Sequence, residues 1–316
     1  MPNSRLIKWL LALSLFLIAL VLFLFYRQVP HDQEPYAKAV DSATGICLLE
    51  GKLGVQLNKV GESWTVHPVS APEIKAGESA GSVPAENDRV KNLLSELKDV
   101  QVEDVISDRP DRQAEFEINP DSGMRVVLLT PSSTLADGIF GKQAPDFTHI
   151  YFRFPDKPSI YLARGIIRGE LGRPIVNDWR SRRLIDLPET KIQAILMEGS
   201  GFKTDLVRAS SDVWTMNGKV VETGPVDALV GTLAHLQAMD FIDSASTPKL
   251  TYEGLTNARV VVKSVDSPVV ELRIGAEEVK SQRYPVSTSQ ETGLAWLPEN
   301  SLKAILQKPS AFKEKH

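Results

Sequence analysis

The stretch "VKNLLSELKDVQVEDVI" (residues 90–106) decides how the chain folds, because its pattern returns as "VDALVGTLAHLQAMDFI" at residues 226–242. In both stretches apolar residues recur at positions i, i+3, i+4, i+7 and i+10, which line one face of an α-helix. The two stretches therefore predict two amphipathic helices, each packed against a core of its own.

The similarity continues on both sides of these helices. "RVVLL" (125–129) matches "RVVVK" (259–263), and Gly141 matches Gly275 at a repeated strand end. Upstream, Trp64 and Trp214 each lead a strand after a polar turn. Apolar residues alternate around these positions, as they do in half-buried strands.

The predicted fold class is α+β. We expect an N-terminal single transmembrane helix and two repeated units, each a mostly antiparallel sheet with one packed amphipathic helix. The expected organisation is a cytoplasmic N-terminus (1–8), the transmembrane helix (9–26), a linker (27–43), a first unit (44–186) with a flexible insertion at about 70–84, a second unit (190–308) and a tail (309–316).

The membrane segment is "WLLALSLFLIALVLFLFY" at residues 9–26. As a helix it would rise about 27 Å, close to the hydrocarbon thickness of a bilayer. Arg5 and Lys8 precede it, which places the N-terminus in the cytoplasm and the rest in a periplasm-like space. A cleaved signal peptide is the alternative, but it has a shorter apolar core and a small-x-small site directly after it. An uncleaved anchor in the bacterial inner membrane is therefore expected.

Composition excludes several chemistries. Cys47 is the one cysteine, so neither an intramolecular disulfide nor a thiolate zinc site can form. The formal net charge is −4, and the first 27 residues hold three basic and no acidic side chains, so the remainder is more acidic still. Non-specific nucleic-acid binding needs a basic face. We expect no catalytic, cofactor-binding or metal-binding residues and no nucleic-acid partner.

"GESAG" (77–81) fits the G-x-S-x-G pattern of a serine hydrolase, with Ser79 as its nucleophile. That elbow needs a buried strand before it and a helix directly after it. Here the stretch falls in the insertion, since Trp64 lies much further from its helix than Trp214 does. Ser79 is therefore predicted to be a loop residue.

The unusual charge cluster is "ARGIIRGELGRPIVNDWRSRRLIDLP" (163–188) between the units. Its candidate docking residues are Trp179, Arg180, Arg182, Arg183, Arg164, Arg168 and Arg173. Arginine forks bind carboxylates and phosphates, so the cluster could dock an acidic partner loop or anionic headgroups. It could equally be a structural connector whose arginines pair with carboxylates of the two units.

Several motifs together resemble a known family. They are the V-x-x-L-[LV]-x-x-L helix, the pairs Phe116-Glu117 and Tyr252-Glu253, the strand ends at Gly141 and Gly275, and "WRSR" (179–182) closing the first unit. The chain resembles a tandem copy of the bacterial domain of unknown function 4340. The second unit departs from it in lacking W-R-x-R.

The resemblance implies a single-span membrane protein, often encoded beside an ABC transporter and its gliding-motility-type auxiliary subunit. It brings no enzymatic activity and no cofactor. We therefore expect a non-enzymatic accessory or scaffolding subunit whose partner is a transporter permease or auxiliary subunit. Two alternatives remain: an envelope hydrolase or glycan-modifying enzyme with an unrecognised site between the units, and a module that binds anionic lipid or an envelope polymer.

Overall fold

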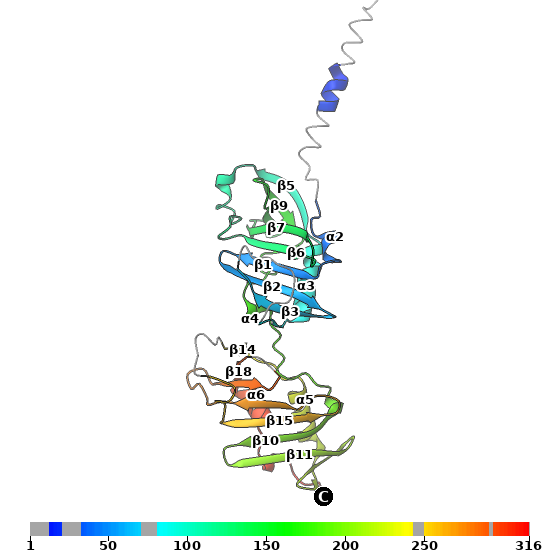
Figure 1. Ribbon diagram of the computed structural model, residues 1–316, viewed down its shortest axis with the longest axis vertical. Helices are drawn as coiled ribbons and strands as arrows, with labels where there is room; N and C mark the ends of the chain where they lie inside the picture. The colour runs from blue at the N-terminus through cyan, green and yellow to red at the C-terminus, as the bar shows by residue number, and fades with distance from the viewer. Residues whose placement is uncertain (1–12, 21–32, 71–80, 243–249, 291–292, 316) are drawn as a thin grey trace, which may run out of the picture. The chain divides into compact units, whose positions relative to one another are not determined.

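The computed structural model describes residues 13–20, 33–70, 81–242, 250–290 and 293–315. The chain divides into two compact units, Met1–Ser181 and Arg182–His316 (Figure 1). Each unit is built on one nine-stranded sheet.

In the first sheet the strand order is β4-β3-β2-β1-β6-β7-β8-β9-β5, and all neighbours are antiparallel. The strands are β1 (Gly45–Glu50), β2 (Leu53–Val60), β3 (Ser63–Pro68), β4 (Val83–Pro84), β5 (Gln101–Ser107), β6 (Met124–Leu129), β7 (Thr134–Gln143), β8 (Ile150–Arg153) and β9 (Ile160–Arg164). The helices are α2 (Ala37–Val40), α3 (Asn87–Lys98), the 3-10 turn η1 (Pro110–Arg112) and α4 (Val176–Trp179).

The second sheet has the order β13-β12-β11-β10-β15-β16-β17-β18-β14, again antiparallel throughout. Its strands are β10 (Ile192–Gly199), β11 (Phe202–Ser210), β12 (Val213–Met216), β13 (Lys219–Val220), β14 (Asp240–Phe241), β15 (Ala258–Ser264), β16 (Val270–Ile274), β17 (Arg283–Thr288) and β18 (Ala295–Pro298). The helices are η2 (Glu189–Lys191), α5 (Thr223–Ala234), α6 (Glu299–Ile305) and η3 (Pro309–Ala311). Strand for strand, this is the order of the first sheet.

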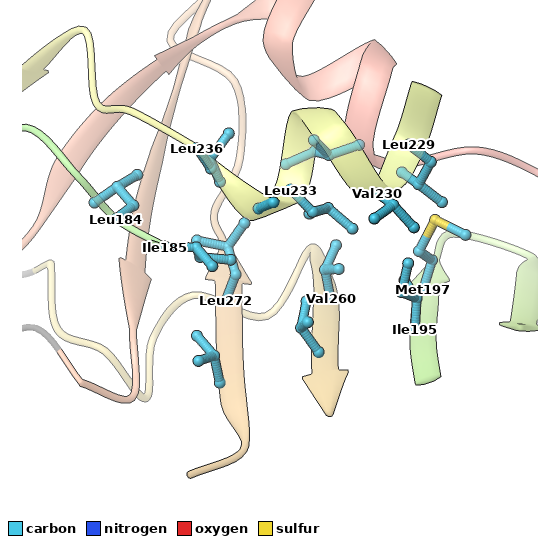
Figure 2. Close-up of a cluster of buried hydrophobic side chains, with 14 of the residues drawn as sticks. Leu184, Ile185, Ile195, Met197, Leu229, Val230, Leu233, Leu236, Val260 and Leu272 are labelled. Atoms are coloured by element: carbon cyan, nitrogen blue, oxygen red, sulfur yellow. The ribbon is translucent and has the colours of Figure 1, made fainter. Parts of the chain in front are cut away.

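Helix α5 packs on one face of the second sheet (Figure 2). Its buried residues are Val226, Leu229, Val230, Leu233 and Ala234, and they share a core with Ile195 and Met197 of β10, Val260 of β15 and Leu272 of β16. Burial of one such side chain stabilises the fold by about 1.5–3 kcal/mol. The sheet therefore keeps its apolar side toward α5 and its charged side away from it.

Helix α3 packs on the first sheet through the same stripe. Val90, Leu93 and Leu97 are buried in one core with Trp64 of β3. The predicted stripe runs on to Val100, but the helix ends at Lys98 and β5 begins at Gln101. Val100 is buried all the same, in the turn between the two elements.

The predicted α+β class is wrong, because the described residues are mostly β. The sequence predicts about six strands a unit, whereas each sheet has nine. The excess lies partly in two-residue strands, β4, β13 and β14, which are too short to show any alternation.

Residues 13–20 of the predicted transmembrane helix are helical, while residues 9–12 and 21–26 lie outside the described residues. Among the residues that are described, no helix combines the length and the apolar character needed to cross a bilayer. Most of the predicted insertion, residues 71–80 with Ser79, also lies outside the described part.

The two tryptophans of the repeat are both buried, and the two glycines are both closely approached by another segment. Trp64 and Trp214 are 4% and 0% exposed. Each is the second residue of its strand, β3 for Trp64 and β12 for Trp214. A Cβ on Gly141 would lie 2.2 Å from the carbonyl oxygen of Phe116, and one on Gly275 would lie 2.7 Å from the Pro285 ring. Both glycines therefore allow a close approach of another segment.

Each unit includes more chain than the repeat predicts. Tyr36, in the predicted linker, is fully buried and its hydroxyl donates to the carbonyl oxygen of Val126 at 2.8 Å. Phe312, in the predicted tail, is 2% exposed in the core of the second unit.

Candidate functional site

The arginine-rich segment does not form one cluster within either unit. The unit boundary falls between Ser181 and Arg182, so Arg164, Arg168, Arg173 and Arg180 belong to the first unit and Arg182 and Arg183 to the second. This boundary lies earlier than the sequence predicts, inside the "WRSR" run itself.

Arginines of the first unit pair with carboxylates of that unit. The Nε of Arg164 lies 2.6 Å from Glu103 Oε1, and a guanidinium nitrogen of Arg173 lies 2.6 Å from Asp178 Oδ1. Arg168 pairs with Glu50. These contacts agree with the structural alternative for the segment.

Trp179 is fully buried in the core of the first unit. Its indole Nε1 donates to the carbonyl oxygen of Arg173 at 2.9 Å, and the Arg89 guanidinium lies over the ring at 4.6 Å. The ring is thus already in contact with arginine, from within its own unit, and is not exposed to a partner.

Residues 179–181 cover the edge strand β4. The amide of Glu86 donates to the Trp179 carbonyl at 2.8 Å, and the amide of Ser181 donates to the Pro84 carbonyl at 2.8 Å. Between these bonds, Ala85 and Arg180 form an antiparallel bridge. The backbone of the "WRSR" run therefore covers the β4 edge of the first sheet.

The second unit closes its sheet in the same way without a W-R-x-R sequence. The backbone amide of Glu222 donates to the Lys313 carbonyl at 2.9 Å, and the backbone amide of Lys315 donates to the Val220 carbonyl at 3.0 Å. Between these bonds, Val221 and Glu314 form an antiparallel bridge. We call residues 179–181 and 313–315 the closing segments. Both closing segments act through backbone hydrogen bonds, so this role does not require the same side chains in the two units.

The second unit's arginines also have partners there. Arg182 donates to the Met239 carbonyl at 2.9 Å, and Arg183 pairs with Asp186 at 2.8 Å. Docking of a partner on this segment stays a prediction. The arginines that a partner could reach are Arg164, Arg173 and Arg183, whose side chains are partly exposed.

Two hairpin tips, which sequence reasoning missed, expose large apolar side chains. Phe147 follows β7 and Val279 follows β16, and these two hairpins occupy corresponding places in the two sheets. Both side chains are 79% exposed, the highest value for a large apolar side chain among the described residues. The signal available in the sequence was one large apolar residue within the polar segment that follows each of the repeat glycines, Gly141 and Gly275.

The turn that carries Phe147 is held by its neighbours. Asp146 Oδ1 accepts hydrogen bonds from the amides of Thr148 and His149, both at 3.0 Å. The side chain of Gln143 donates to the His149 carbonyl at 2.9 Å and accepts from the Arg168 amide at 3.1 Å. Phe147 itself has a φ of 60°, a conformation that costs energy in a bulky residue.

His149 links this turn to strand β5. Its Nδ1 lies 2.6 Å from Asp146 Oδ2 and its Nε2 lies 3.1 Å from Glu103 Oε2. The Asp146 carboxylate raises the pKa of His149, with a smaller effect from Glu103. Hydrogen bonds from the backbone and side chain of His149 lower the pKa of Asp146 to about 2.

The turn that carries Val279 is held by Glu278. Its amide donates to the Arg283 carbonyl at 2.9 Å, and its carboxylate accepts from Ser281 at 2.5 Å and from Arg283 Nε at 2.6 Å. The bond from Arg283 is the main reason that the pKa of Glu278 is lowered. Each unit thus presents its exposed apolar side chain on a turn that is fixed by a carboxylate.

The outer face of β1–β3 carries a buried polar row. Cys47 Sγ donates to Gln56 Oε1 at 3.4 Å, Gln56 Nε2 donates to Asn58 Oδ1 at 2.8 Å, and Asn58 Nδ2 lies 3.4 Å from His67 Nδ1. Burial raises the pKa of Cys47 to about 12 and lowers that of His67. Burial therefore disfavours the nucleophilic thiolate form of Cys47.

Across the described ranges, no group of three or more His, Cys, Asp or Glu side chains is placed to hold a metal ion.

Comparison with known families and proteins gives one match. The model of the family described as "Domain of unknown function (DUF4340)" matches residues 78–258, more than half of the chain, as one span that crosses the unit boundary. No curated protein shows significant sequence similarity to the chain. Of the family motifs quoted above, all but Gly275 lie inside the matched span. The chain therefore belongs to the DUF4340 family.

Proposed function

We propose that the protein is a non-enzymatic accessory or scaffolding subunit of an ABC-type transport or export system in the bacterial cell envelope. The apolar segment 9–26, preceded by Arg5 and Lys8, would attach it to the inner membrane with its N-terminus in the cytoplasm. The two sheet units would then lie on the periplasmic side, where they would meet a permease or auxiliary subunit.

The observation that carries the proposal is the pair of exposed side chains at corresponding hairpins, Phe147 and Val279. A single exposed apolar residue is ordinary on a protein surface. Here one strongly exposed apolar side chain lies on the corresponding hairpin of each unit, although the two residues are not at equivalent repeat positions, and this shared exposure supports a shared role. A large apolar side chain on a fixed turn can enter a partner's pocket with little loss of conformational entropy.

The charges around the turns favour a protein partner of mixed polarity. Asp146 and Glu278 stand directly beside Phe147 and Val279, and both carboxylates are already hydrogen-bonded within their turns. An apolar anchor with a polar surround is the usual arrangement of a protein–protein contact.

We also propose that the two units arose by internal duplication of one family domain. The identical strand order and the equivalent closing segments support this proposal. Trp64 and Trp214, and Gly141 and Gly275, would then be the residues that both copies retained.

The test is co-purification of the full-length protein with its neighbours from membranes in mild detergent. Variants Phe147→Ser and Val279→Ser are compared with wild type. Leu53→Ser and Val269→Ser serve as matched controls, because both residues are exposed and lie elsewhere in the same units, at the start of β2 and directly before β16. We expect transporter subunits to co-purify with wild type and both controls, and to decrease at least fivefold with the two tip variants.

Equal recovery with the tip variants would contradict docking through the hairpins. The complete absence of transporter subunits from the wild-type sample would contradict the accessory role itself. Thermal melting of each variant shows that the fold is kept, since all four side chains are exposed.

A further inference from the structure

The second unit has an open recess of about 310 Å³, lined by charged, polar and apolar residues, where the charged side chains of β15 and β16 point away from α5. Arg259 of β15 and Arg273 of β16 line it together with Glu198, Glu271, Thr256 and Asn257. In β15 the next residue after Arg259, Val260, points to the core instead. The recess is therefore a feature of the charged face.

Two arginines lie directly opposite each other in this recess. Arg259 and Arg273 are register partners on neighbouring strands, and Arg259 is in turn the partner of Glu198 on β10. Side chains in such positions have Cβ atoms about 4.5–5.5 Å apart, and like charges there destabilise a sheet. Their presence calls for a compensating group.

The protein's own carboxylates compensate only part of this charge. Glu198 pairs with Arg259 and also lies 3.0 Å from Lys203, while Arg273 Nε lies 2.8 Å from Glu271 Oε1. The recess itself is lined by two arginines and two glutamates, and Glu198 is shared with Lys203, which lies outside the recess. Both arginines use their Nε atom for the carboxylate, and among the described residues the terminal nitrogens of Arg259 have no hydrogen-bond acceptor.

The geometry of the recess is fixed in advance. The Arg273 guanidinium lies over the Tyr252 ring at 4.4 Å, which restrains the plane of its fork. The backbone amide of Asn257 donates to the Ile274 carbonyl at 3.0 Å, so the segment that carries Thr256 and Asn257 is held against β16. A restrained fork loses less entropy when it binds an anion.

The first unit shows that the fold does not need these arginines. There the corresponding register pair is Arg125 and Ile139, and Ile139 is buried in an apolar cluster with Phe116 and Ile118. Arg125 binds Asp137 through two nitrogens at 2.9 and 2.6 Å. The position of Arg273 is therefore taken by a buried isoleucine in the first unit, and Arg125 is left with a bidentate carboxylate partner of its own.

We propose that the recess is a binding site for a small hydroxylated anion, such as an acidic sugar. Arg259 and Arg273 hold its carboxylate or phosphate group, and Thr256 and Asn257 bond to neighbouring hydroxyl groups. Guanidinium forks bind both kinds of anionic group. The volume lies at the lower end of the range for small-molecule sites, which suits a ligand the size of a monosaccharide.

The experiment is isothermal titration calorimetry of the full-length protein in detergent with glucuronate, glucose 6-phosphate, glucose and inorganic phosphate. The main variant is Arg273→Ile, which places there the residue type that the first unit has. Arg259→Lys keeps the charge but removes the fork. Lys263→Gln is the control, because this exposed residue lies on the same face of β15 but outside the recess.

We expect at least one sugar anion to bind to the wild type, and glucose not to bind. Arg273→Ile should weaken binding at least tenfold, Arg259→Lys by a smaller factor, and Lys263→Gln less than twofold. Tighter binding of glucuronate identifies a carboxylate ligand, and tighter binding of glucose 6-phosphate a phosphate ligand. Far-UV circular dichroism of each variant shows that the sheet is intact.

Three results would overturn the site. They are a wild type that binds neither sugar anion, an unchanged affinity in Arg273→Ile, and equal loss in Lys263→Gln and Arg273→Ile. Equal affinity for inorganic phosphate and the sugar anions would overturn the role of Thr256 and Asn257. None of these results depends on the transporter partner, so the site and the accessory role are tested separately.

Discussion

At the residue scale, Gly141 and Gly275 show how equivalent positions can differ in what they tolerate. An added Cβ meets a backbone carbonyl at 2.2 Å at Gly141, but side-chain atoms of Pro285 and Leu255 at 2.7 and 2.8 Å at Gly275. We expect Gly141→Ala to destabilise its unit by about 1–3 kcal/mol, and Gly275→Ala to destabilise its unit by less. Urea denaturation followed through amide signals of β7 and β16 measures both, and equal losses would contradict the comparison.

The sequence predicts single residues well where the repeat supplies two copies to compare. Trp64 and Trp214 are both buried, as a Trp-led strand predicts. Trp179 has no tryptophan counterpart in the second unit, and its sequence context left both a docking role and a structural role open. Its burial follows from the backbone pairing of residues 179–181 with the β4 edge, which no side-chain pattern reveals.

At the element scale, the hairpin that carries Phe147 should depend on pH through His149 and Asp146. The pKa of His149 is raised, so its contribution to stability is complete below the ordinary value of 6.5 and is lost as pH rises through the folded pKa. The pKa of Asp146 is lowered to about 2, so its contribution is complete above the ordinary value of 3.8 and is lost as pH falls toward 2. The two interactions therefore stabilise the hairpin most between about pH 3.8 and pH 6.5.

Asp146→Asn should lower the pKa of His149, because the Asp146 carboxylate is the main cause of its rise. Glu103→Gln should lower it less. An NMR titration of the His149 ring in the wild type and both variants measures the order, and a larger effect of Glu103→Gln would contradict it.

The sequence predicts long helices and strands better than short ones. The stripes of α3 and α5 placed both helices correctly, because twelve residues give several turns of the period. Strands β4, β13 and β14 have two residues each and no period to detect. The polar recess was equally hidden, since Arg259 and Arg273 come together only through the register of β15 and β16.

At the scale of the whole molecule, each unit has a hydrophobic core made only of its own residues. The core of the second unit begins at Leu184, and the cores of the first unit end at Trp179. We expect residues 33–181 and 182–316 to fold when expressed separately. Well-dispersed amide NMR spectra of the two fragments would show this, whereas a collapsed spectrum of either fragment would contradict it.

The closing segments give this arrangement a consequence for how such chains change over time. An uncovered edge strand invites pairing with other chains, and each unit covers its own with its last residues. A stretch of gene that encodes one unit also encodes the segment that covers this edge, so the unit can be copied, moved or lost without uncovering the same edge in the other unit. The gain or loss of a whole unit during evolution then exposes no new strand at this edge. For the same reason, a protein engineer can use one unit as a building block.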